Sequence, residues 1–251
     1  MASLDRASSA TVIDFQDVEV SRGGRPVLRG VTLGVRAGEV VALVGRSGSG
    51  KTTLLRLVNR LADADSGTVQ VSGTDVTTWD AIALRRQVGY AIQDVGLFPH
   101  FTVADNVATV PRLLEWPADR VAARVDELLT LVGLEPSQFR ARWPDQLSGG
   151  QRQRVGLARA LAADPPVLLM DEPFGALDPI TRVELHREFR ALQAKLPRAV
   201  LLVTHDLSEA FALAARIAVL HEGRVLACDT PERLGEVDDE HVRALLDTRF
   251  G

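Results

Sequence analysis

Short runs of hydrophobic residues alternate along the chain with longer segments in which apolar positions recur at helical spacing. Residues 40–44, 167–170, 200–204 and 217–220 are almost entirely apolar, and each run has the length of one strand. Uninterrupted apolar runs of this length are typical of strands that are buried on both faces of a parallel sheet. We therefore predict that these four runs form the centre of such a sheet.

Helices are predicted between these runs, where an apolar residue recurs every three or four positions. Residues 51–61 form one such segment, and residues 185–196 form another. Asp178 precedes the second segment as a predicted N-cap with a proline directly after it. Asp206, followed by Glu209, indicates the start of a further helix. Buried strands that alternate with helices predict an α/β fold with a mostly parallel sheet.

The N-terminal part of the chain has a different pattern. Residues 12–20 and 31–35 alternate between apolar and polar positions, as half-exposed strands do, and residues 22–26 predict a turn between them. Residues 67–79 combine short apolar stretches with turn residues. We expect short strands and turns in this region.

Residues 101–164 change character again and predict a helical block. The block contains an apolar stripe that ends at Gly133, a residue type that commonly follows the last turn of a helix. We interpret the block as an insertion into the α/β core. The stripe consists of Val121, Val125, Leu128, Leu129 and Val132.

Composition narrows the classes of function. With 46% hydrophobic and 25% charged residues among 251, the chain has the composition of a globular protein. The 29 basic and 33 acidic residues give a net charge of −4, which disfavours a nucleic-acid partner. The single cysteine, Cys228, excludes an intramolecular disulfide, and we expect it to be a structural thiol. The sequence shows no run long enough to span a bilayer and no apolar signal core, so we expect a membrane role only through a partner.

Only two of the 29 basic residues are lysines, Lys51 and Lys195. Lys51 belongs to the sequence GRSGSGKT, which fits the pattern G-x-x-x-x-G-K-[ST] between a predicted strand and a predicted helix. Glycines let backbone N–H groups surround a phosphate, the lysine adds a compact charge, and the hydroxyl of Thr52 is a ligand for Mg²⁺. The predicted nucleotide-binding residues here are Gly45, Arg46, Ser47, Gly48, Ser49, Gly50, Lys51, Thr52 and Thr53.

Two carboxylates follow the apolar run 167–170. Ligands of open α/β sheets bind at the carboxyl ends of the strands, where Asp171 and Glu172 are expected. Cleavage of a nucleoside triphosphate needs a metal ion and an activated water molecule. We predict that Asp171 holds Mg²⁺ and that Glu172 is the general base, with Lys51 also counted as catalytic.

Residues 147–151 read LSGGQ and open a predicted helix. At this motif the chain resembles the ATP-binding cassette family, the nucleotide-hydrolysing subunits of ABC transporters, and the resemblance covers about residues 12–235. The resemblance implies a P-loop NTPase (RecA-like) core with an N-terminal antiparallel β subdomain and an inserted α-helical subdomain. It also implies that a second subunit's ATP is bound by Ser148, Gly149, Gly150 and Gln151.

The resemblance assigns further residues. Gln93 matches the glutamine that contacts metal and water, Asp178 belongs to the D-loop, and His205 matches the switch histidine. Many family members stack an aromatic residue on adenine, whereas this chain has Arg22 at that position. We expect the planar guanidinium of Arg22 to stack on the base instead.

The resemblance also implies how the chain is divided. We expect one ATPase domain over residues 12–235 and a short tail over residues 236–251. Within the domain, the core is predicted at 12–95 and 165–235, and the helical subdomain at about 96–164. Many family members carry an additional C-terminal regulatory module, and the tail is too short to hold one.

The partners implied by the resemblance are a second copy of the chain, arranged head to tail, and transmembrane permease subunits on which the dimer docks. A solute-binding protein takes part indirectly, and the expected location is the cytoplasmic face of the cell membrane, as a peripheral protein. Phe98 and Phe101 are candidates either for the permease contact or for burial in the helical block.

Finer similarities point to importers of quaternary amines such as glycine betaine, choline and carnitine. They lie in residues 89–93, 96–100, 110–116 and 160–182. An ATPase of another importer, of an exporter, or of a soluble system unrelated to transport remains an alternative. A GTPase is disfavoured because the sequence contains no base-reading Asn-Lys-x-Asp motif.

Overall fold

The computed structural model describes residues 10–92, 95–175 and 177–247. These residues form two compact units. The first contains the chain up to Arg85 and from Pro197 onward, and the second contains Arg86–Leu196. The helical segment expected at about 96–164 lies inside the second unit, and its exact bounds as a subdomain stay a prediction.

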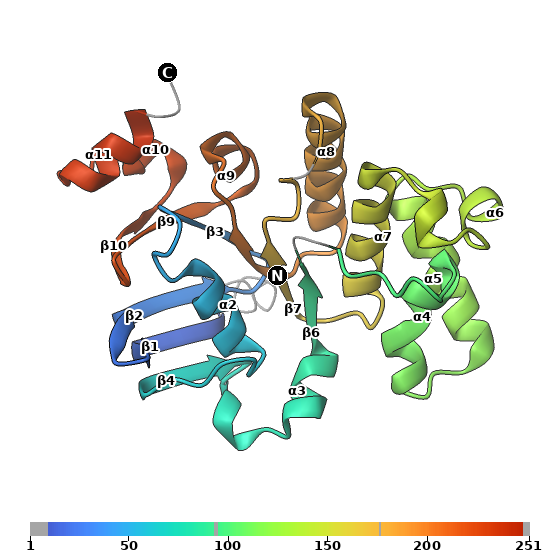
Figure 1. Ribbon diagram of the computed structural model, residues 1–251, viewed down its shortest axis with the longest axis horizontal. Coiled ribbons are helices and arrows are strands. Elements are labelled where there is room, and N and C mark those ends of the chain that lie inside the picture. The colour runs from blue at the N-terminus through green and yellow to red at the C-terminus, as the bar shows by residue number, and fades with distance from the viewer. Residues whose placement is uncertain (1–9, 93–94, 176, 248–251) are drawn as a thin grey trace, which may run out of the picture. The chain divides into compact units, whose positions relative to one another are not determined.

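An antiparallel sheet forms one part of the first unit (Figure 1). Its strand order is β2-β1-β4-β5. The apolar positions of β1 and β2 face the core in alternation with exposed ones, which confirms the predicted half-exposed strands. The predicted turn at 22–26 was too long, because Arg22 already pairs with Arg25 and only two glycines connect the strands. The strands are β1 (Thr11–Arg22), β2 (Arg25–Arg36), β4 (Ser66–Val71) and β5 (Thr74–Asp75).

A second set of strands in the first unit is mainly parallel. β3 (Val40–Val44) pairs in parallel with β8 (Ala199–Val203) and β9 (Arg216–His221). Every residue of β3 and β8 is buried, as their uniform apolar sequences predict. β10 (Arg224–Asp229) pairs antiparallel with β9 and was not predicted.

Short helices complete the first unit. The helix predicted over residues 51–61 ends at Val58, because the backbone turns away through Asn59 and Arg60, and Leu61 is 53% exposed. Asp206 caps the next predicted helix by accepting hydrogen bonds from the amides of Ser208 and Glu209. The helices are α2 (Lys51–Val58), η1 (Val76–Thr78), α3 (Ala81–Gln87), α9 (Leu207–Leu213), α10 (Pro231–Leu234) and α11 (Glu240–Asp247).

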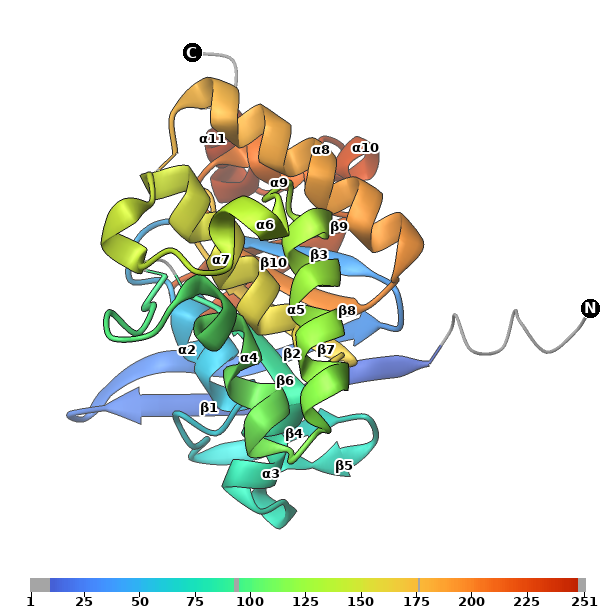
Figure 2. The same ribbon diagram turned by 90° about the vertical axis from the view of Figure 1, so that its right-hand side faces the viewer.

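The second unit contains two parallel strands and the longest helices of the described residues. β6 (Val88–Ala91) pairs with β7 (Val167–Asp171), and the sequence pattern missed β6 because Gly89 and Tyr90 interrupt its apolar run. Figure 2 shows α4, α5 and α7 close together. The helices are α4 (Val103–Leu113), α5 (Ala118–Leu131), α6 (Pro136–Phe139), η2 (Pro144–Gln146), α7 (Gly149–Leu161) and α8 (Pro179–Lys195).

Two predicted helices in this unit are confirmed, although each ends one residue earlier than predicted. The apolar stripe lies on α5, where its members are buried, and Val132 caps the helix instead of belonging to it. Asp178 is the N-cap of α8 and accepts hydrogen bonds from the amides of Ile180 and Thr181 at 3.1 and 3.0 Å. Leu196, expected as the last residue of this helix, is its C-cap.

A half-buried ion pair connects the start of β3 to β9. Arg216 donates from Nε and Nη2 to the two carboxylate oxygens of Glu39 at 2.6 and 2.9 Å, and from Nη2 to the carbonyl of Gly34 at 2.7 Å. Burial opposes ionisation of Glu39. The hydrogen bonds from Arg216 and from the amide of Arg36 outweigh it and hold the pKa of Glu39 below its ordinary value.

We expect Glu39→Gln to lower the free energy of unfolding at pH 7 by about 1–3 kcal/mol, because Arg216 loses a bidentate partner. The folded pKa is lower than the unfolded pKa, so this contribution is complete above the unfolded value and disappears as the pH falls through the folded value. Urea unfolding at pH 7 and at pH 3 measures both effects. The exposed Glu236→Gln is the control, and an equal loss in both variants would contradict the assignment.

Candidate functional site

The phosphate loop connects β3 to α2 in the first unit. Gly45 has a φ of 147°, and a Cβ at this position would lie 2.1 Å from the carbonyl oxygen of Leu220. No other residue fits there without moving the backbone. Gly50 precedes α2 and offers no side-chain acceptor to the first amides of that helix. The loop therefore leaves the positive end of α2 available for an anion.

Two side chains in this loop fit an anionic ligand. Lys51 is only 8% exposed, and its ammonium group donates to the carbonyls of Gly45 and Arg46 at 2.7 and 3.0 Å. The hydroxyl of Ser49 is buried and has no hydrogen-bond partner among the described residues. A buried hydroxyl without a partner is costly unless a ligand completes it. Lys51 and Ser49 are thus suited to bind phosphate, and Thr52 and Thr53 lie in the adjoining first turn of α2.

His205 lies at the surface just after β8, in the same unit. Its neighbour Thr204 is buried, donates from Oγ1 to Glu209 at 3.1 Å and accepts from the amide of Asp206 at 3.0 Å. These bonds fix the turn that presents the imidazole. The family resemblance assigned His205 and the sequence pattern gave Asp206 and Glu209 as a helix start, but neither indicated the hydrogen bond between Thr204 and Glu209. Arg22 is exposed at the last position of β1.

The two predicted carboxylates lie in the second unit. Asp171 is the last residue of β7 and accepts a hydrogen bond from the hydroxyl of Tyr90 at 3.3 Å. Glu172 follows with a φ of 47°. A residue other than glycine adopts this left-handed conformation only when its surroundings support it, and such residues concentrate at functional sites. Tyr90, which the sequence analysis did not select, orients one of the two carboxylates.

The LSGGQ segment forms the start of α7. Ser148 is the N-cap, and its hydroxyl accepts from the amide of Gln151 at 3.2 Å. The side chain of Gln151 accepts in return from the amide of Ser148 at 3.0 Å. Gly149 is exposed and Gly150 is half-buried. The positive end of a 13-residue helix therefore lies at the surface, where it suits an anion presented from outside.

The predicted site residues are divided between the two units. The phosphate-loop residues, Arg22 and His205 belong to the first unit, whereas the acidic pair and the LSGGQ segment belong to the second. Gln93 lies outside the described residues. Asp178 is exposed, and its carboxylate already caps α8, so its predicted contact with a nucleotide stays a prediction.

Phe98 and Phe101 lie in contact, with ring centroids 5.2 Å apart, and Phe98 is partly exposed. Asn106 is fully buried below them and was missed in the sequence analysis. Its side chain accepts from the amide of Phe98 and donates to the carbonyls of Phe98, Phe101 and Thr102. This anchor holds the aromatic loop, and the two predicted roles of the rings both remain open.

No helix of the described residues combines the length and the apolar character needed to cross a bilayer. Cys228 is half-buried and its sulfur accepts from Arg216 at 3.4 Å, and burial raises the pKa of its thiol. A thiol with a raised pKa is a weak nucleophile at neutral pH. This agrees with the structural role expected for Cys228.

Comparison with known proteins places these features in a family. A family model described as ABC transporter matches residues 28–175. The chain is 48% identical over 220 residues to the glycine betaine uptake system ATP-binding protein YehX of Escherichia coli, covering 88% of this chain and 71% of that one. It is 45% identical over 216 residues to the glycine betaine/carnitine/choline transport ATP-binding protein OpuCA of Bacillus subtilis, covering 86% and 57%.

The osmoprotectant import ATP-binding protein OsmV of Salmonella typhimurium is 47% identical over 217 residues, covering 86% of this chain and 57% of that one. The chain thus spans little more than half the length of OpuCA and OsmV. Among solved structures, a dimeric ATP-binding cassette in a post-hydrolysis state, bound to ADP and Pi, superposes with a TM-score of 0.77. That cassette is 32% identical, and the match covers 87% of this chain and 98% of the cassette.

Proposed function

The chain belongs to the ABC transporter family, and we propose that it is the ATP-hydrolysing subunit of an importer for quaternary amines such as glycine betaine. The phosphate loop carries the proposal, because buried Ser49 and Lys51 are arranged for an anion at the start of α2. Identities of 45–48% to three uptake ATP-binding proteins support the class of substrate.

Binding of ATP begins at the loop. Its amides and the hydroxyl of Ser49 donate to the phosphate oxygens, and Lys51 exchanges the loop carbonyls for the outer phosphates. Arg22 is assigned to the adenine ring, on which its guanidinium can stack. This arrangement supplies position and positive charge, which are the main requirements of phosphoryl transfer.

Hydrolysis requires residues of the second unit as well. Thr52, Asp171 and Gln93 offer the oxygen ligands that Mg²⁺ prefers, and the ion neutralises charge on the phosphates when bound. Glu172 accepts a proton from the attacking water molecule. His205 is assigned to the terminal phosphate. The neighbouring Thr204, which is buried and bonded to Glu209, fixes the turn that keeps the imidazole at the surface.

A second copy of the chain completes each site in this proposal. The surface start of α7 presents Ser148, Gly149, Gly150 and Gln151 to the ATP of the opposite subunit. On α8, just after the capping residue Asp178, Ile180 and Val183 are 75% and 67% exposed. Large apolar side chains at such exposure favour a protein contact. The dimeric state of the similar cassette supports the same arrangement.

Membrane subunits and a solute-binding protein complete the proposed importer. The dimer docks on the permease at the cytoplasmic face of the membrane, and Phe98 and Phe101 are candidates for that contact. The proposal includes no contact with nucleic acid. Closure of the dimer on ATP switches the access of the permease, and hydrolysis resets it.

We expect Lys51→Arg to reduce ATP hydrolysis at least a hundredfold. The buried ammonium group donates to two loop carbonyls as a compact point charge, which a planar guanidinium does not reproduce. Steady-state phosphate release measures the change. Lys195→Arg is the matched control, because Lys195 is exposed at the end of α8, and it should retain full activity. An active Lys51→Arg protein would remove this residue from the mechanism.

We expect Glu172→Gln to bind ATP but to lose hydrolysis, because the amide cannot accept the proton of the water molecule. The variant should therefore accumulate as an ATP-bound dimer, which light scattering detects with ATP and not with ADP. Glu184→Gln, an exposed carboxylate on α8, is the control. Hydrolysis at the wild-type rate would show that Glu172 is not the base.

The transported substrate is tested with the partner proteins. The chain should co-purify with a permease that spans the membrane several times, which separates an importer from a soluble ATPase unrelated to transport. In reconstituted vesicles with the solute-binding protein, glycine betaine, choline or carnitine should stimulate ATP hydrolysis several-fold. Stimulation by none of them, with intact basal hydrolysis, would overturn the substrate class and leave the ATPase assignment standing.

A further inference from the structure

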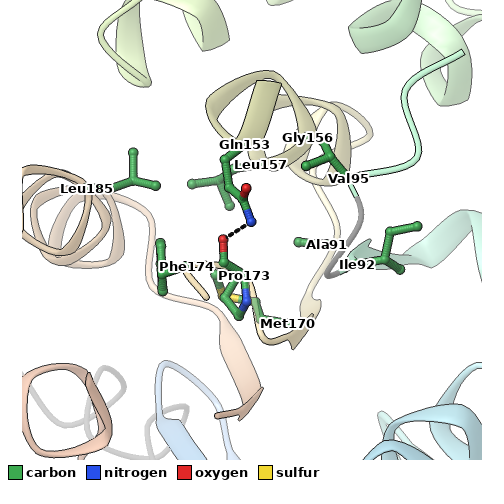
Figure 3. Close-up of a pocket in the computed structure, with 10 residues that line it drawn as sticks. All are labelled: Ala91, Ile92, Val95, Gln153, Gly156, Leu157, Met170, Pro173, Phe174 and Leu185. Atoms are coloured by element: carbon green, nitrogen blue, oxygen red, sulfur yellow. Dashed lines mark hydrogen bonds between the residues drawn. The ribbon is translucent and has the colours of Figure 1, made fainter. Parts of the chain in front are cut away.

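One buried amide connects the LSGGQ helix to the turn that contains Glu172. Gln153 lies one turn into α7 and is only 7% exposed. Its Nε2 donates to the carbonyl oxygen of Pro173, as the dashed line in Figure 3 shows. Pro173 directly follows Glu172, so this bond ties α7 to the backbone next to the proposed base.

The surroundings of Gln153 are otherwise apolar. Together with its neighbours it lines a cavity of about 10 Å³, which has room for one water molecule at most. Of the described residues that line this cavity, Gln153 alone carries a polar side chain (Figure 3). A buried amide among apolar neighbours is expensive unless it makes a needed hydrogen bond. The other lining residues include Met170, Phe174 and Leu185.

The turn needs such support because its backbone is unusual. Glu172 has a left-handed φ of 47°, a conformation that local propensity does not favour. On one side, Asp171 is bonded to Tyr90. On the other, the ring of Phe174 meets those of His186 and Phe189 edge-on, at centroid distances of 4.8 and 6.3 Å. Between these two restraints, the carbonyl of Pro173 is the backbone group that Gln153 orients.

The same helix also contacts the segment that follows Gln93. A Cβ on Gly156 would lie 2.6 Å from Cγ1 of Val95, so this close approach requires glycine. Arg159 donates to the carbonyls of Val95 and Gly96 at 2.6 and 2.7 Å. Positions 153, 156 and 159 recur every three residues and thus face one side of α7. That side of α7 therefore contacts the backbone next to Glu172 and the segment after Gln93, the two residues proposed to contact the water molecule.

We propose that Gln153 is a positioning residue for Glu172. Its amide fixes the Pro173 carbonyl and thereby holds Glu172 in the left-handed conformation that directs its carboxylate to the water molecule. Gln153 lies five residues from Ser148, so an anion bound at the start of α7 and the base of the same chain share one rigid connection. This inference rests on the proposed ATPase function.

The test replaces the donor without emptying the space. Gln153→Met keeps the length of the side chain, suits the apolar cavity and removes the hydrogen bond. We expect kcat for ATP to fall about tenfold or more while KM stays within twofold. A loss confined to kcat is the mark of an interaction made in the transition state. Gln138→Met, an exposed glutamine on α6, is the matched control and should match the wild type.

A second readout separates positioning from general damage. If Gln153 acts through Glu172, adding Gln153→Met to Glu172→Gln costs little further single-turnover hydrolysis, and the double variant still forms the ATP-bound dimer. A merely structural defect would multiply the two losses and raise KM. Thermal unfolding of each variant reports the folded fraction, and Gln153→Leu, which also lacks a donor and suits the apolar surroundings, replaces Gln153→Met if the latter does not fold.

The outcomes are distinct. A kcat within twofold of the wild type in a folded Gln153→Met protein, or losses that multiply with Glu172→Gln, would overturn the positioning role. A wild-type chain without ATPase activity would instead overturn the proposed function. A selective loss of kcat that disappears in the Glu172→Gln background supports the inference.

Discussion

The proposed chemistry depends on leaving the first backbone amides of two helices available to a ligand. At the start of a helix, nearby side chains normally accept hydrogen bonds from the first backbone amides, because these amides have no partner within the helix. At α2 the preceding residue is Gly50, which offers no such acceptor. At α7 Ser148 and Gln151 satisfy one amide each and leave the remaining end exposed. Both starts are therefore suited to phosphate, and the glycines around them follow from that constraint.

The side chains of Asp171, Glu172 and His205 are positioned differently, because each lies at or just beyond the end of a buried strand. Asp171 is the last residue of β7, whose other residues are buried, and His205 comes shortly after the buried strand β8, so apolar burial fixes the point where each chain segment emerges. Beneath them lie polar side chains that make specific bonds: Tyr90 to Asp171, Thr204 to Glu209, and Gln153 to Pro173. The reactive residues are thus held by neighbours that carry no motif.

This difference explains what the sequence could predict. The phosphate loop, the acidic pair and LSGGQ are recognisable because their chemistry requires particular residues at fixed spacing. The buried strands are recognisable because burial on both faces excludes polar residues. β6 was missed because Gly89 and Tyr90 interrupt its short apolar run, and Gly89 serves a close approach to the carbonyl of Ala160 that only three-dimensional structure reveals.

Supporting residues were missed for a related reason. Gln153 lies four positions before the buried Leu157, so a polar residue on the apolar face of a helix was a visible signal, but its partner is 20 positions away. Asn106 donates to backbone carbonyls of an irregular loop, and no regular spacing in the sequence predicts where these carbonyls lie. Hydrogen bonds to distant or irregular backbone leave no periodicity, and they become evident only when the chain is folded.

The contacts of Lys51 differ from those of two arginines that each serve several acceptors. The planar group of Arg216 donates to Glu39 and Gly34, and that of Arg159 donates to two successive carbonyls. Lys51 instead places a single ammonium nitrogen within hydrogen-bond distance of the carbonyls of Gly45 and Arg46. In the proposed function, this compact cation leaves those carbonyls for a phosphate chain, and that role would account for a lysine at this position in a chain that uses arginine at 27 of its 29 basic positions.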